Sequence, residues 1–143
     1  MGIEEQFRQV QQAINSPEPK TRMNERLAPE FVSANEAEKT SVIQFTAQEW
    51  ELNQRGEVHG GAVASMFDTA MGMTSVAYSG GTPVATADLN VSYIRPFTGQ
   101  KFLFESKIHN LGRMMIRLHC VAKDAATGKT LATATSTFVP YRK

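Results

Sequence analysis

Residues 59–78 read HGGAVASMFDTAMGMTSVAY, and this stretch decides the fold. From Ala62 to Ala77 the residues are apolar or small on every side of a helical wheel, with a single charge. A helix without a polar face is enclosed by protein. Twenty residues form a helix roughly 30 Å long, enough to cross a small domain. Because the pair Gly80-Gly81 follows and suits a helix end, the sequence predicts a long buried central helix over about residues 59–78.

Stretches typical of β-strands lie on both sides of this helix. Turn residues separate them, and Leu89, Val91 and Tyr93 alternate with polar residues, as in a strand with one buried face. The short connections favour an antiparallel meander. We therefore predict an α+β fold in which a curved antiparallel β-sheet wraps around the central helix. The predicted strands lie near residues 31–35, 40–46, 83–93, 101–109, 114–124 and 130–139.

The amino-terminal segment predicts one further helix. Four apolar residues recur there at helical spacing, which indicates an amphipathic helix over about residues 3–14. Residues 16–30 hold three of the six prolines and are predicted to form a connecting loop. A chain of 143 residues has the size of one domain. We expect a single domain, with an N-terminal helix and loop at 1–27 and the core at 28–140.

Composition narrows the class of protein. Apolar residues make up 41% and charged residues 20%, as in an ordinary globular protein. The single cysteine, Cys120, excludes an internal disulfide framework and suits a reducing compartment. No secretory leader is recognisable at residues 1–6, and the apolar run 62–77 is too short for a membrane span. Three scattered histidines provide no metal-ligand spacing. We expect a soluble cytoplasmic protein without a metal and without a membrane partner.

The charge is distributed unevenly. A net charge of +1 argues against a nucleic-acid partner. Residues 1–58 carry −4, whereas residues 59–143 carry +5. A modestly basic second half suits an anionic ligand with a few phosphates, although it also suits a solvated face that binds nothing.

Asp68 is the most informative residue. It is the only charged side chain between Gly60 and Asp88, and it lies within the apolar helix. Desolvating a carboxylate costs several kcal/mol unless the group is paired or hydrogen-bonded. A protein keeps such a group either in a satisfied polar network or for chemistry, above all as a general base. Both interpretations are open at this point.

His59-Gly60-Gly61 precedes the helix and supplies a second candidate group. Glycines allow close approach of a ligand to the backbone, and the first N–H groups of a helix can bind an anion or polarise a carbonyl. A glycine pair at a helix start can also be simply a tight turn. Asp68 follows His59 by nine residues, about 13 Å along a helix. This separation is too large for one reacting carbonyl within a single chain, and sheet edges also favour subunit pairing. We therefore expect a homodimer with a shared site, and two such dimers in a tetramer are plausible.

At this point a family resemblance becomes specific. The pattern Asn53-x5-His59-Gly60-Gly61-x6-Asp68-Thr69-Ala70 resembles the signature of the hotdog thioesterase superfamily, phenylacetate-degradation (PaaI-like) type. The segment ADLNVSYIRP at 87–96 is similar to the strand after the family's central helix, and Gly128-Lys129 with the closing Thr-rich strand also match. The resemblance covers about residues 28–140. It implies a hotdog fold and hydrolysis of an acyl- or aryl-CoA thioester to free acid and CoA. No cofactor is implied, since coenzyme A is part of the substrate.

The resemblance also implies roles for individual residues. Asp68 matches the carboxylate that activates water or attacks the acyl carbon, and the Gly60 N–H matches the group that polarises the thioester carbonyl. Asn53 matches a side-chain amide near that carbonyl. Thr86 matches a hydroxyl that helps hold the attacking water, at a position where a serine is expected. In relatives the amide and the glycine come from one subunit and the carboxylate from the other.

Several assignments stay open. His59 is either a catalytic base, as in hotdog dehydratases, which would make the protein a hydratase or dehydratase, or a residue whose imidazole fixes the helix entry through a local hydrogen bond. His109 and His119 are expected to be structural or surface groups. A non-catalytic acyl-CoA-binding protein is the alternative to an enzyme. The candidates for contacts to CoA are Gly61, Arg95, Arg113 and Lys129, with Arg113 as first choice because it follows Gly112 at a predicted hairpin tip.

Overall fold

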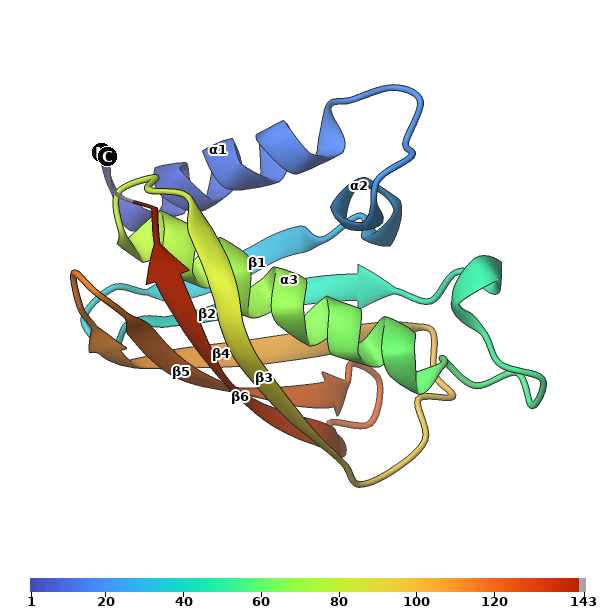
Figure 1. The fold of residues 1–143 in the computed structure, drawn as a ribbon. Helices are drawn as coiled ribbons and strands as arrows, with labels where there is room; N and C mark the ends of the chain where they lie inside the picture. The colour runs from blue at the N-terminus through green and yellow to red at the C-terminus, as the bar shows by residue number, and fades with distance from the viewer. Residues whose placement is uncertain (142–143) are drawn as a thin grey trace.

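The computed structural model describes residues 1–141. Two of the residues in the predicted domain, 142 and 143, lie outside this range. The elements appear in Figure 1 in the order α1 (Ile3–Asn15), α2 (Met23–Leu27), β1 (Glu30–Asn35), β2 (Thr40–Thr46), the 3-10 turn η1 (Glu49–Glu51), α3 (Gly60–Tyr78), β3 (Val84–Tyr93), β4 (Lys101–Leu111), β5 (Ile116–Asp124) and β6 (Thr130–Pro140).

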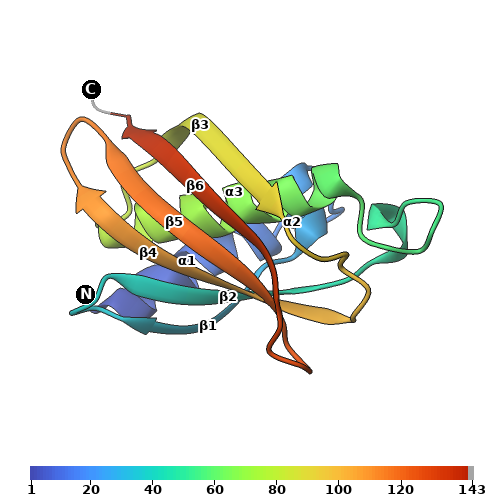
Figure 2. The same ribbon diagram turned by 90° about the horizontal axis from the view of Figure 1, so that it is seen from below.

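The six strands form one antiparallel sheet in the order β1-β2-β4-β5-β6-β3. The sheet curves around α3, and α1 lies beside α3 on the same side of the sheet (Figures 1 and 2). This is the predicted architecture, a curved antiparallel sheet wrapped around a long central helix. In this strand order β1 and β3 are the two edge strands of the sheet.

The core is built between α3 and the inner face of the sheet. Phe67 of α3 meets Phe104 of β4 edge-on, with ring centroids 4.7 Å apart, and Phe104 meets Phe45 of β2 at 5.1 Å. Edge-to-face pairs of this kind add to the stabilisation from apolar burial. The helix ends as predicted, because Gly80 and Gly81 adopt positive φ and the Gly81 N–H donates to the Val76 carbonyl at 2.9 Å.

The prediction that α3 is enclosed on every side is only partly right. Four residues at successive steps of four remain half-exposed in the single chain: Ala64, Asp68, Gly72 and Val76. Residues at this spacing share one side of a helix. The opposite side of α3 is buried against the sheet, whereas this side meets strands β3 and β6 at its margin, where Thr86 contacts Asp68 and Phe138 lies beside Gly72. We call these four residues the α3 stripe.

Two local predictions were wrong. Residues 16–30 are not only a loop, since they contain the short helix α2. Its start is closed by Glu25, whose carboxylate accepts hydrogen bonds from the N–H groups of Thr21 (3.1 Å) and Arg22 (3.0 Å). Five residues are too few to produce a helical period in the sequence, so the pattern gave no signal for α2.

The strand β3 also departs from the predicted meander. It pairs with β6 and not with β4, its neighbour in sequence. The connection 94–100, which contains the buried Phe97, leads from β3 at one edge of the sheet to β4, which lies between β2 and β5. In β3 itself Leu89 and Val91 are half-buried against the core, whereas Tyr93 is 52% exposed. The predicted alternation therefore holds for the first two residues and fails at the strand's end.

Candidate active site

Asp68 and Thr86 lie together, although 18 residues separate them in the sequence. The hydroxyl of Thr86 donates a hydrogen bond to Asp68 Oδ1 at 2.7 Å. Asp68 comes from the middle of α3 and Thr86 from β3, just before a register shift between Thr86 and Asp88. The carboxylate thus has one oxygen held in place and is half-exposed. The hydrogen bond from Thr86 thus orients the carboxylate and leaves its second oxygen available.

A cavity of about 510 Å³ opens beside this carboxylate. We call it the Asp68 groove. It lies between α1, α3 and the adjoining ends of β3 and β6. Near Asp68, the Thr69 hydroxyl donates to Asn24 Oδ1 of α2 at 2.6 Å, which ties α2 to α3. Away from Asp68 the lining is largely apolar, with contributions from Val10, Ala13, Met73, Val84 and Phe138.

The amino-terminal end of α3 has a different arrangement. His59 is the N-cap residue, and its Nδ1 accepts a hydrogen bond from the Gly61 N–H at 2.8 Å. The Gly60 N–H meets no acceptor within residues 1–141. It therefore remains an unpaired donor at the positive end of the helix dipole. The imidazole of His59 already serves the local role that was one of its two predicted interpretations.

Asn53 lies in the loop that leads to this helix end. Its side-chain Oδ1 accepts hydrogen bonds from the N–H groups of Arg55 (2.9 Å) and Glu57 (3.2 Å), and so shapes the loop around Gly56. Asn53 and Gly60 line a second cavity of about 310 Å³, together with Tyr93 and Arg95. We call this cavity the Gly60 hollow.

The structure therefore gathers the predicted residues into two groups. Asp68 and Thr86 line the Asp68 groove, whereas Asn53 and Gly60 line the Gly60 hollow. Gly60 and Asp68 are eight residues apart on one helix, about 12 Å of rise. A single carbonyl carbon does not reach both groups within one chain.

The predicted basic residues are divided in a similar way. Arg95 lines the Gly60 hollow, and its Nη1 donates to the Thr130 carbonyl at 2.6 Å, beside Lys129. Arg113 is exposed in the β4–β5 connection, which lies at the opposite end of the sheet from the β5–β6 connection that contains Lys129 (Figure 2). Among the three, Arg95 is the one that shares a cavity with Gly60.

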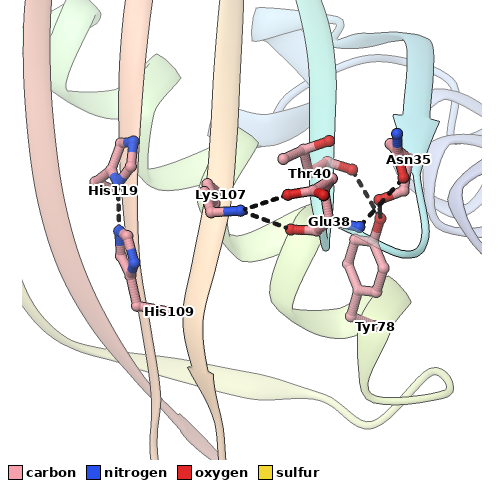
Figure 3. Close-up of polar contacts among 7 residues, drawn as sticks. All are labelled: Asn35, Glu38, Thr40, Tyr78, Lys107, His109 and His119. Atoms are coloured by element: carbon pink, nitrogen blue, oxygen red, sulfur yellow. Dashed lines mark hydrogen bonds and ion pairs between the residues drawn. The ribbon is translucent and has the colours of Figure 1, made fainter.

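Tyrosine hydroxyls hold both ends of α3. Tyr93 of β3 donates to the Gly60 carbonyl at 2.5 Å, and burial raises its pKa, which keeps the donating proton in place. At the other end Tyr78 donates to the Thr40 carbonyl (2.7 Å) and the Asn35 carbonyl (3.1 Å), as Figure 3 shows. Burial raises the pKa of Tyr78 to about 12. Asp68 thus lies on a helix that is fixed at both ends.

Sequence reasoning missed Tyr93 and Asn24 as contributors to this region. In the sequence Tyr93 was interpreted only as part of a strand. Asn24 belongs to the helix α2, which the sequence pattern did not predict. His109 and His119 face each other across β4 and β5, with ring centroids 4.6 Å apart, near the Lys107–Glu38 ion pair (Figure 3). Neither histidine lines the Asp68 groove or the Gly60 hollow. The sequence did not predict that these two histidines contact each other.

Within residues 1–141, no cluster of three or more His, Cys, Asp or Glu side chains is arranged to hold a metal ion. None of the helices that the structure describes has both the length and the apolar character needed to cross a membrane.

Comparison with solved structures places the fold. The PaaI protein from the phenylacetic acid degradation operon of E. coli superposes with a TM-score of 0.80 at 18% identity, covering 99% of this chain and 97% of that one. A Streptococcus mutans protein crystallised with acetyl CoA superposes with a TM-score of 0.70 at 19% identity, over 80% and 90% of the two chains. The predicted hotdog fold is confirmed.

Sequence comparison defines the family. The family model of the thioesterase superfamily matches residues 55–131, more than half of the chain. The chain therefore belongs to the thioesterase superfamily, and the predicted enzyme class, a thioester hydrolase, is confirmed with it. Human acyl-coenzyme A thioesterase 13 is 24% identical over 114 residues, which cover 79% of this chain and 81% of the human protein.

Proposed function

We propose that this protein is an acyl-CoA thioesterase, which hydrolyses an acyl- or aryl-CoA thioester to the free carboxylic acid and CoA. The observation that carries the proposal is the carboxylate of Asp68, held by Thr86 at the mouth of a largely apolar groove. A relative named acyl-coenzyme A thioesterase 13 and a structural neighbour bound to acetyl CoA support this choice of thioester.

The geometry supports Asp68 as a general base. Its Oδ1 is engaged by Thr86, and in this mechanism the other oxygen takes a proton from a water molecule, whose oxygen attacks the thioester carbon. The resulting oxyanion is stabilised by the Gly60 N–H at the positive end of α3, with the Asn53 amide close by. Collapse then breaks the C–S bond, and the proton on Asp68 passes to the leaving sulfur. Direct attack by Asp68 on the acyl carbon is the alternative for the same residue.

The two groups of residues act together only if they come from different subunits. We propose a homodimer in which the Gly60 hollow of one subunit faces the Asp68 groove of the other. The half-exposed α3 stripe and the edge position of β3 support this pairing, because both leave surface that a second copy would cover. A tetramer of two such dimers is compatible with the same contact. Each subunit would be one hotdog domain.

The proposal assigns no cofactor and a reducing, cytoplasmic location. Coenzyme A enters as part of the substrate, and neither water activation by Asp68 nor oxyanion binding at Gly60 calls for another group. The thiol of Cys120 is buried, and burial raises its pKa to about 12, so it is inert toward disulfide exchange. A reduced thiol of this kind suits the cytoplasm.

A thiol-release assay across several acyl-CoAs tests the proposed function. Wild-type protein should release free CoA from at least one apolar acyl- or aryl-CoA in a range typical of enzymes, with kcat of about 1–10³ per second. Calorimetric binding of the same compounds without any thiol release would instead indicate an acyl-CoA-binding protein. Hydration of an enoyl-CoA without thiol release would favour the hydratase alternative, although Nδ1 of His59 is already occupied by Gly61.

Arg95 is now our first candidate for a contact to the CoA phosphates, in place of Arg113, because it lines the Gly60 hollow. Arg95→Ala should raise KM for acyl-CoA about fivefold, the size expected for a partly solvated charged contact. It should also weaken the salt dependence of KM, while the matching pantetheine thioester is hydrolysed as before. If Arg113→Ala produces this pattern and Arg95→Ala does not, the nucleotide lies at the β4–β5 connection.

A further inference from the structure

One position in the Asp68 groove lacks a side chain. Gly72 lies one helical turn beyond Asp68 in the α3 stripe and lines the same cavity. Glycine is the least favourable residue after proline in the interior of a helix, because it has the most backbone freedom to lose. The fold therefore carries an unfavourable residue at this point.

Neither the backbone nor the packing requires glycine there. Gly72 is not among the glycines with positive φ, so an L-amino acid can adopt its conformation. A Cβ built on Gly72 would meet Phe138 Cε1 at 3.4 Å and Cζ at 3.7 Å, and no backbone atom of another element lies within 4 Å among its nearest neighbours. A methyl group would thus touch one aromatic ring without displacing the chain. Without a Cβ, Gly72 leaves room for about one methyl group beside the Phe138 ring, and a larger side chain there would have to extend into the groove.

That space lies on the path an acyl group would follow. The groove is lined by α3 from Asp68 to Val76, which is about 12 Å of helix rise. Its far end is marked by Gln6 and Gly81, and the lining between the two ends includes Gln9 of α1 but is otherwise mainly apolar. A thioester whose carbonyl lies at Asp68 has room for a long tail only if the tail passes Gly72. A two-carbon acyl group ends before that point.

We propose that Gly72 sets the size of the acyl group that the enzyme accepts, and that the preferred substrates carry an apolar acyl chain of medium length or an aryl ring. This inference rests on the proposed function. The acyl group lies between Gly72 of α3 and the apolar side of α1, with Phe138 as the floor. Gly72 is a specificity-determining residue and takes no part in proton transfer.

The test compares Gly72→Ala and Gly72→Leu with wild type on acetyl-CoA, octanoyl-CoA and phenylacetyl-CoA. Gly72→Leu should lower kcat/KM for the two larger substrates by at least about tenfold, because filling a pocket by a few carbons costs this much discrimination. Acetyl-CoA hydrolysis should change by less than about twofold on the same reasoning. Gly72→Ala should show a smaller change in the same direction, and its Tm should be equal or higher because alanine favours a helix.

Two further variants distinguish an effect of side-chain size in the groove from a general effect on the stability of the protein. Ala37→Leu adds a side chain of the same size to an exposed turn between β1 and β2 and should leave the acyl preference unchanged. Phe138→Leu enlarges the groove floor opposite Gly72 and should shift the preference toward bulkier acyl groups. Equal losses on all three substrates for a Gly72→Ala protein with wild-type Tm would overturn the proposal.

A binding measurement distinguishes failure of this inference from failure of the proposed function. Calorimetric titration with octanoyl-CoA should show binding to wild type and at least about tenfold weaker binding to Gly72→Leu. If wild type binds but releases no thiol, the hydrolase proposal fails, and the size-selective site stands on the binding difference. If octanoyl-CoA binds both proteins equally, or binds neither, the assignment of Gly72 is wrong.

Discussion

Replacing Asp68 by asparagine should lower kcat for thioester hydrolysis by about 10²–10⁴-fold, the usual contribution of a general base. Asparagine keeps the size of aspartate, and its side-chain oxygen can accept the hydrogen bond that Thr86 donates to Asp68. Because the site is half-exposed, a neutral amide is tolerated there. The loss should therefore appear in kcat, with the Tm and the binding of acyl-CoA close to wild type.

A matched control for this experiment lies on the neighbouring strand. Asp88 of β3 is exposed and accepts a hydrogen bond from the Thr137 N–H at 2.9 Å, away from the Asp68 groove. Asp88→Asn makes the same chemical change two residues after Thr86 and should retain wild-type kcat within about twofold, as expected of a surface substitution. Near wild-type turnover by Asp68→Asn, in protein whose Asp88→Asn counterpart behaves as expected, would exclude Asp68 as the base.

Subunit mixing should restore activity to two inactive variants. Asn53→Ala removes the amide of the Gly60 hollow, and Asp68→Ala removes the base of the Asp68 groove. If each site combines the two cavities from different subunits, a mixed dimer contains one complete site. Complete exchange of equal amounts should then recover about a quarter of wild-type activity, because half of the dimers are mixed and each has one of two sites intact.

A second mixture tests the same arrangement by loss of activity, so that the conclusion does not depend on activity being restored. When the double variant Asn53→Ala/Asp68→Ala is exchanged with wild type, every mixed dimer has two incomplete sites under the shared-site arrangement. An excess of the double variant should therefore abolish wild-type activity. A site contained within one chain would leave each wild-type subunit active, so proportional activity, together with mixed dimers detected by native mass spectrometry, would contradict the proposed dimer.

The helix α3 and most strands could be predicted from the sequence because their signals are local. An apolar run closed by two glycines indicates a buried helix, and the predicted strand 40–46 matches β2 in both bounds. The helix α2 gave no such signal, since five residues closed by Glu25 carry no period. The position of β3 in the sheet could not be predicted from local pattern, because it depends on pairing with β6, whose residues follow their β3 partners by 39 (Tyr93 and Ala132) to 56 (Val84 and Pro140) positions.

The same distinction applies to the candidate site. Asp68 was identifiable from the sequence alone, as the one charge in an apolar helix, and the helix rise already separated it from Gly60. The sequence did not show that Thr86 reaches the carboxylate, because that contact depends on where β3 crosses α3. Nor did it show that α1 closes the groove opposite Gly72. The sequence by itself determined which elements form and which carboxylate is unusual, since both follow from neighbours along the chain. Only the tertiary structure decided the strand order, the partner of Asp68 and the shape of the groove, since these depend on contacts between residues far apart in sequence.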